Sequence, residues 1–379
     1  MEAEITAMRD IILSNAVLFA EIPAPTHKES KRIQFLIDRF QEAQLDNISV
    51  DEAGNGLGLI PGTEGKNTIL MVAHADTVMK GLHDPVMSLD ADRITGPGIA
   101  KNSIGLSLLA TLPKLFERMD IRLKDNIQLV GVTQSRGKGN LAGINHFLDE
   151  HKRVLYRAGV CVEGVQLGRL SYSSIGMLRA KIFLDIPEDY DWSQTGASGA
   201  IGHMNQLISQ LRGIRLPKEP KTNIVFGSLN CGTAYNTVPL QGILRFEIQS
   251  NDFGVVTEIE EEVLEILHSM EVEHGIQLRM KEIARRSPGG ISFGHPLVKT
   301  VRSVLEALEV DTRIDPSTGE LSALLGADIP SVTLGVSKGK KIHETDEYLL
   351  IDPICSGVTQ IVSVLQNIDE GNCDDRELD

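Results

Sequence analysis

Hydrophobic and polar positions alternate along this chain with two different periods. Apolar residues recur every three to four positions over residues 3–20 and 28–43, which predicts two amphipathic helices. Short apolar runs at residues 48–52, 56–60 and 68–73 are typical of strands. The pattern then predicts a helix, a strand, a helix and a strand, at residues 102–118, 126–134, 141–151 and 158–163. Helices that alternate with buried strands indicate an α/β layer with a largely parallel sheet.

The pattern changes near residue 170. From there the chain predicts four strands and two helices, which make a compact α+β unit: strands at 177–186, 223–229, 242–249 and 276–284, and helices at 200–211 and 255–273. The α/β pattern resumes with a helix, a strand and a helix at residues 296–308, 331–336 and 354–367. We therefore expect one α/β domain made of residues 1–170 and 287–379, with a second domain at residues 171–286 inserted into it.

Composition narrows the class of protein. A length of 379 residues suits two domains, and a hydrophobic fraction of 41% is ordinary for a soluble globular protein. The net charge of -15 argues against nucleic acid or anionic membrane as a partner, and no apolar stretch is long enough for a membrane span. Four scattered cysteines with no CxxC pair, and no signal-peptide pattern at the start, predict a cytoplasmic protein.

One strand ends in residues that suit metal chemistry. The apolar run at 68–73 leads directly into His74 and Asp76. A histidine at the carboxyl end of a buried strand, with a carboxylate two residues later, is typical of a zinc ligand held in place by an acidic neighbour. This pair is the first candidate site.

Six ordered motifs together resemble the di-zinc aminoacylase and carboxypeptidase-type metallopeptidases, which include tripeptide aminopeptidases. They are IPAPT at 22–26, HADTV at 74–78, GPGIAKNSIG at 96–105, GNLAG at 139–143, GTAYNTVP at 232–239 and HETDEY at 343–348. The resemblance implies a zinc-peptidase-like three-layer α/β catalytic domain with a largely parallel sheet. It also implies an inserted α+β lid domain through which two chains form a homodimer.

The chain departs from this family at the positions that matter most for catalysis. The family's bridging aspartate, which joins two zinc ions, is replaced by Lys101. Its general-base glutamate and the adjacent metal-binding glutamate are replaced by Ser135 and Arg136. A serine cannot take a proton from water near neutral pH without a base of its own. Ordinary peptidase or deacylase activity is therefore predicted to be absent.

The family's remaining ligand positions are His74, Glu163 and His343, with Asp76 behind the first of them. By the resemblance, two ligands remain for the first zinc ion and one for the second. Catalytic zinc normally has three protein ligands. A cation about 4 Å from a metal ion costs about 4 kcal/mol per unit charge at an intermediate dielectric constant. We therefore expect no metal and no other cofactor, although the family uses two zinc ions.

The two substituted cations suggest an electrostatic replacement for the metal. Lys101 is predicted to pair with Glu163 or Asp76, and Arg136 with Glu163 or Asp346. The alternative is that both are solvated loop cations. In the inserted domain, the family's ligand-binding histidine has no counterpart at residues 188–191, which read EDYD. Asn236 is a candidate ligand-binding residue there, although a polar contact within a turn explains it equally well.

Three functions compete at this point. The first is a homologue without the di-zinc centre and the general base, which binds a short peptide or an acylated amino acid through Lys101 and Arg136. The second is a hydrolase with weak, mononuclear-metal or altered activity. The third is a non-catalytic subunit that dimerises through the inserted domain. The fold alone does not choose between them.

Overall fold

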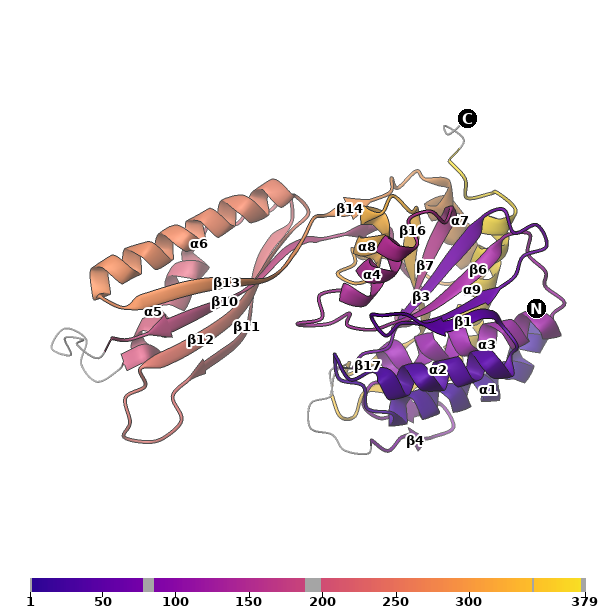
Figure 1. The fold of residues 1–379 in the computed structure, drawn as a ribbon, viewed down its shortest axis with the longest axis horizontal. Helices are drawn as coiled ribbons and strands as arrows, with labels where there is room; N and C mark the ends of the chain where they lie inside the picture. Colours follow the sequence, from indigo (N-terminus) through magenta and orange to yellow (C-terminus); the bar gives the residue numbers. More distant parts are fainter. Residues whose placement is uncertain (1, 78–84, 188–198, 343, 376–379) are drawn as a thin grey trace. The chain divides into compact units, whose positions relative to one another are not determined.

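The computed structural model describes residues 2–77, 85–187, 199–342 and 344–375. The chain divides into two compact units (Figure 1). The larger unit is formed by residues 1–173 and 290–379, and the smaller unit by residues 174–289. Predicted His343 lies outside the described residues, as do residues 188–191.

The larger unit is built on an eight-stranded sheet. The strands run in the order β1 (Asp46–Val50), β2 (Gly56–Ile60), β6 (Asn126–Val132), β3 (Thr68–His74), β7 (Tyr156–Val165), β16 (Ser331–Ser337), β8 (Arg169–Ser171) and β15 (Arg313–Ile314). The four central strands, β6, β3, β7 and β16, are mutually parallel. All seven residues of β3 are buried, as expected of a central parallel strand covered on both faces. The predicted α/β class with a largely parallel sheet is confirmed.

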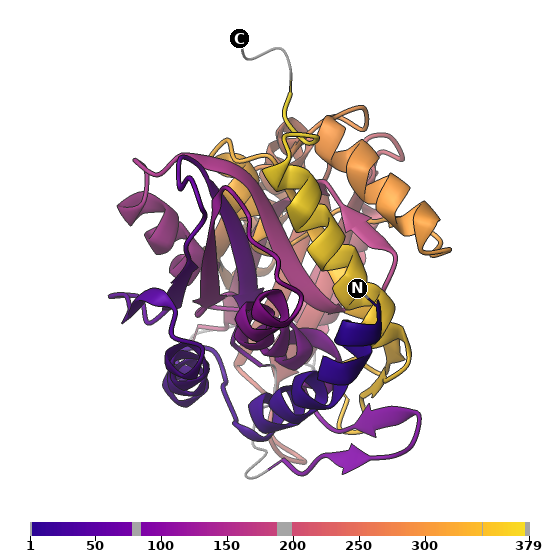
Figure 2. The same ribbon diagram turned by 90° about the vertical axis from the view of Figure 1, so that its right-hand side faces the viewer.

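Helices cover both faces of this sheet. Side chains that alternate along β3 point to opposite faces, so Ile69 and Met71 join one core and Leu70 and Val72 join another. The first core is closed by α1 (Glu2–Glu21), α2 (Ser30–Glu42), α3 (Ile104–Arg118), α7 (Pro296–Ala307) and α9 (Pro353–Asp369). The second is closed by α4 (Ala142–Glu150) and α8 (Leu321–Gly326). Figure 2 shows α1 beside α9, although they lie at opposite ends of the chain.

A short sheet and a π-helix complete the larger unit. The sheet contains β17 (Gly339–Lys340), β18 (Tyr348–Leu350), β5 (Arg93–Thr95) and β4 (Ser88–Leu89), in that order. The π-helix η1 (Ile99–Ser103) leads directly into α3. Within the described residues, no helix has the combination of length and apolar character that crossing a bilayer requires.

The smaller unit is a four-stranded antiparallel sheet with two helices. Its strands lie in the order β11 (Thr222–Cys231), β12 (Gln241–Ser250), β10 (Gly176–Asp185) and β13 (Gln277–Arg286). The helices α5 (Gly199–Gly213) and α6 (Phe253–His274) pack on one face. The Asp252 side chain caps α6 by accepting the N–H of Gly254, and Gly275 ends it in the left-handed conformation. The chain enters and leaves this unit through the short strands β9 (Ser173–Ser174) and β14 (Gly289–Gly290), which pair with each other.

Candidate functional site

The candidate residues gather at the carboxyl ends of the central parallel strands, where open α/β sheets bind their ligands. His74 is the last residue of β3, and Glu163 lies near the end of β7. The two strands pair in parallel with Val72 opposite Cys161, so two residues further on His74 lies opposite Glu163. The topology therefore brings together two positions that are 89 residues apart in the sequence, from 74 to 163.

Asp76 is the most completely hydrogen-bonded member of the site. Its side chain is 0% exposed, and Oδ1 lies 3.1 Å from Nδ1 of His74. Its Oδ2 accepts the Thr26 hydroxyl and the backbone N–H of Arg136, both at 2.8 Å. Burial alone would raise the pKa of Asp76, but the His74 hydrogen bond and charge, with the other two donors, hold it below its usual value. The carboxylate is thus fixed in its ionised form.

Arg32 is a buried cation that the sequence analysis missed. Its side chain is 0% exposed, and it donates to the carbonyl of Ile22 at 2.7 Å and to the carbonyl of Ala75 at 3.3 Å. Burial lowers the pKa of Arg32 to about 9, against the opposing effect of Asp76. Arg32 therefore joins the early turn to the segment that carries His74 and Asp76. The only sequence signal was an arginine at a position next to the buried Ile33 of an amphipathic helix.

Lys101 points toward Glu163. Its Nζ lies 3.9 Å from Oε2 of Glu163, and its side chain is only 25% exposed. The lysine sits in η1, and π-helical turns are frequent at functional sites. The buried Glu347 helps to hold this turn by accepting the N–H of Ala100 at 2.7 Å. Burial lowers the pKa of Lys101, and the negative charge of Glu163 opposes this shift.

Glu163 is also bound by a second cation that was not predicted. Nη1 of Arg169, from β8, lies 2.9 Å from the same Oε2 that faces Lys101. Burial would raise the pKa of Glu163, but Lys101, Arg169, His74 and Arg136 together hold it below its usual value. One buried carboxylate is thus surrounded by several positive charges.

The remaining predicted residues are placed as follows. Ser135 is buried beside Arg136, whose charge lowers the pKa values of both Lys101 and Glu163. Glu163 forms ion pairs with Lys101 and Arg169, and Asp346 forms one with Lys341, while the charge of Arg136 also acts on Glu163, so the predicted pairing of Arg136 stays a prediction. Asn236 is exposed in the loop between β11 and β12 of the smaller unit, with φ at 53°.

These residues do not fit the di-zinc centre that the resemblance implies. Within the described ranges, no group of three histidine, cysteine, aspartate or glutamate side chains is placed to hold a metal ion. Both oxygens of Asp76 already accept hydrogen bonds, and Glu163 is neutralised by Lys101 and Arg169. A divalent ion about 4 Å from the Lys101 ammonium would meet a repulsion of about 8 kcal/mol at an intermediate dielectric constant.

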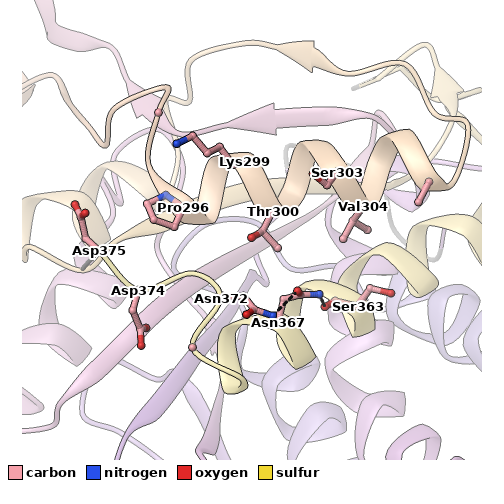
Figure 3. Close-up of a pocket in the computed structure, with 13 residues that line it drawn as sticks. Pro296, Lys299, Thr300, Ser303, Val304, Ser363, Asn367, Asn372, Asp374 and Asp375 are labelled. Carbon is pink, nitrogen blue, oxygen red and sulfur yellow. Dashed lines mark hydrogen bonds between the residues drawn. The ribbon is translucent and has the colours of Figure 1, made fainter. Parts of the chain in front are cut away.

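A groove of about 840 Å³ lies elsewhere on the larger unit, between α7 and α9 (Figure 3). Lys299, Asn367 and Asp374 are among its lining residues. Asn367 is held there by a hydrogen bond of its amide to the carbonyl of Ser363 and by one from Asn372. None of the candidate site residues lines this groove. It is therefore separate from the strand ends that carry His74 and Glu163.

The lowered pKa of Asp76 predicts an acid-dependent loss of stability. Because the pKa of Asp76 is lower in the folded than in the unfolded protein, its ionised carboxylate contributes its full stabilisation above about pH 5. This contribution to the free energy of unfolding is lost as the pH falls through the folded pKa. Asp76→Asn should therefore cost more stability at pH 7 than at pH 3, as measured by urea unfolding followed by circular dichroism. The exposed Asp90→Asn is the control. An equal cost at both pH values would contradict the prediction.

Comparisons with known proteins agree with this architecture. A sequence profile for "Peptidase family M20/M25/M40" matches residues 70–367. Direct comparison with curated protein sequences found no significant match. A tripeptidase from Staphylococcus aureus is similar in structure, with a TM-score of 0.78, 18% identity, and coverage of 96% of this chain and 99% of that one.

Two further structures have the same fold. The dipeptidase Dug1p from Saccharomyces cerevisiae has a TM-score of 0.79 at 12% identity, and covers 97% of this chain and 98% of its own. The Bacillus subtilis YXEP protein, described as a dinuclear metal binding peptidase, has a TM-score of 0.68 at 14% identity, with coverage of 96% and 99%. These likenesses show the fold, and the profile spans most of the sequence. The resemblance predicted from the six motifs is confirmed, and the chain belongs to peptidase family M20/M25/M40.

Proposed function

We propose that this protein binds a small ligand that carries a carboxylate, either a short peptide or an acylated amino acid, and does not hydrolyse it. The observation that carries the proposal is the ion pair between Lys101 and Glu163, at 3.9 Å, in the position where the family places a bridging carboxylate. A fixed side-chain cation there takes the electrostatic role of a metal ion toward Glu163. It does not take the chemical role, because an ammonium cannot activate water.

The same cations supply a reason for carboxylate binding. Lys101, Arg169 and Arg136 all act on the carboxylate of Glu163, so this carboxylate lies among three positive charges. An arginine can bind a carboxylate through two parallel hydrogen bonds, and a lysine adds a point charge. The solved structures with this fold include a tripeptidase and a dipeptidase, whose names point to peptide-sized ligands.

Ser135, which occupies the family's general-base position, supports binding without hydrolysis. Ser135 is buried, and its hydroxyl has no hydrogen-bond partner among the described residues. A serine acts as a nucleophile or as a proton acceptor only when a neighbouring base takes its proton. No such base is hydrogen-bonded to the Ser135 hydroxyl within the described part of the chain.

Zinc content tests the proposal directly. After zinc loading and dialysis, we expect less than about 0.1 zinc ion per chain, because too few ligands converge on one point among the residues that the structure describes. Tripeptides and N-acetylated amino acids should remain intact when incubated with the loaded protein. An active di-zinc peptidase in the same assay is the positive control. One or two tightly held zinc ions together with peptide cleavage would overturn the proposal in favour of a hydrolase with altered metal binding.

We also propose a homodimer formed through the inserted domain. The edge strand β11 is ten residues long and exposes Val225 and Leu229, features that favour pairing with another strand. Light scattering on the preparation used for the zinc measurement should give twice the chain mass, and a monomer would contradict this. A cytoplasmic location remains our expectation, because all four cysteines are free.

A further inference from the structure

Glu320 is a buried carboxylate that the sequence analysis did not single out. It immediately precedes α8 and is 6% exposed. Its Oε1 has no hydrogen-bond partner among the described residues. A buried acceptor without a partner costs stability and is rare in native proteins, so its retention calls for a reason.

Glu320 belongs to the neighbourhood of the candidate site. A Cβ built on the adjacent Gly319 would lie 3.8 Å from Oε1 of Glu163, so the backbone at this point packs against that carboxylate. The charge of Glu320 acts on Lys101 in the same direction as that of Glu163 and also acts on Cys161, which is two residues before Glu163 on β7. No ion pair joins Glu320 to Lys101. The two groups are therefore close enough to interact electrostatically but do not form an ion pair.

Lys101 is also incompletely satisfied. An ammonium has three N–H donors. Within the described part of the chain, the partner of Nζ is Oε2 of Glu163 at 3.9 Å, which is beyond hydrogen-bonding distance. The site therefore contains a partly buried positive donor from η1 and a buried carboxylate acceptor just before α8, each with bonding capacity to spare.

We propose that Glu320 receives the amino group of a zwitterionic ligand, a free amino acid or a short peptide with a free amino terminus, while Lys101 receives the ligand carboxylate. This inference rests on the proposed function and chooses between its two ligand classes. An ammonium brings a positive charge and three donors to Glu320. An acylated nitrogen brings one neutral N–H at most, which would leave the buried charge of Glu320 without a counter-charge.

Calorimetric titration of the full chain with matched ligands tests this inference. The probes are the twenty dipeptides of the form Xaa-Gly and their N-acetyl counterparts. The dipeptide that binds the wild-type protein most tightly should bind about 10- to 100-fold more tightly than its acetylated form, the range expected for a hydrogen bond between charged groups. Glu320→Gln should weaken binding of that dipeptide by about 10-fold or more and leave the acetylated form nearly unchanged. Glu306→Gln, an exposed change on α7, should alter neither affinity.

The possible outcomes separate the role of Glu320 from the proposed function. Equal wild-type affinities for the free and acetylated forms would overturn the role of Glu320 while the proposed function stands, and this comparison needs no variant to fold. Equal weakening of both ligands by Glu320→Gln would mean that Glu320 only supports the fold of the site. Hydrolysis of the dipeptides by zinc-loaded protein would overturn the proposed function instead. Binding of none of the forty probes would overturn both.

Discussion

A triple variant with Lys101→Asp, Ser135→Glu and Arg136→Glu should acquire zinc, rising from less than about 0.1 ion per chain to about one or two. The changes return carboxylates to the positions where the family resemblance places the bridging ligand, the general base and the second metal ligand. They also remove the ammonium that lies 3.9 Å from Glu163. Because a carboxylate attracts the divalent ion that Lys101 repels, the largest part of the gain should come from position 101.

Arg169 should limit the zinc affinity of this triple variant. Its guanidinium lies 2.9 Å from Oε2 of Glu163 and would still compete with a metal ion for that oxygen. Adding Arg169→Met to the triple variant should therefore tighten zinc binding further. Elemental analysis after dialysis, followed by competition with a chelator, measures both effects.

A matched control separates specific binding from the effect of added negative charge. Ser14→Glu, Lys66→Asp and Arg153→Glu change the net charge by the same amount at exposed positions. This control should bind no more zinc than the wild-type protein. If the site variants fold, as judged by circular dichroism, and still bind no zinc, the assignment of positions 101, 135 and 136 to the family's metal motifs would be wrong.

The parts of the site that could be predicted are those carried by local motifs. His74 and Asp76 are two residues apart, at the end of a strand whose apolar run is unmistakable, and their contact follows from that spacing. The partners of Glu163 could be predicted only in part. Lys101 was found because a family position requires a carboxylate there, whereas Arg169 was missed because it follows β7 by a turn and lies in no motif.

The site residues that could not be predicted, Arg32 and Glu320, owe their positions to long-range contacts. Arg32 and Glu320 are charged residues in or beside helices, and sequence periodicity alone assigns such residues to solvent. Their burial depends on how α2 and α8 pack against the rest of the larger unit. Among the secondary-structure elements, the short sheet of β4, β5, β17 and β18 was not predicted, because its strands are only two or three residues long and carry no period.

Glu163→Gln should produce the largest loss of stability among single changes at this site, about 3 kcal/mol. The substitution keeps the shape of the side chain and removes its charge. Lys101 and Arg169, both mostly buried, would then lack their carboxylate partner. Urea unfolding followed by circular dichroism measures the loss, and the exposed Glu306→Gln should cost less than about 0.5 kcal/mol.

A double-mutant cycle determines how much of that loss comes from the lysine. If Lys101 stands in for a metal ion, removing it together with the charge of Glu163 should relieve part of the penalty, because one buried cation no longer lacks a partner. Glu163→Gln with Lys101→Met should therefore be about 1–2 kcal/mol more stable than the sum of the single changes predicts. Simple additivity would mean that Arg169 alone compensates Glu163. Lys101 would then be a bystander in the electrostatics of the site, and the replacement of the metal by a fixed cation would lose its physical basis.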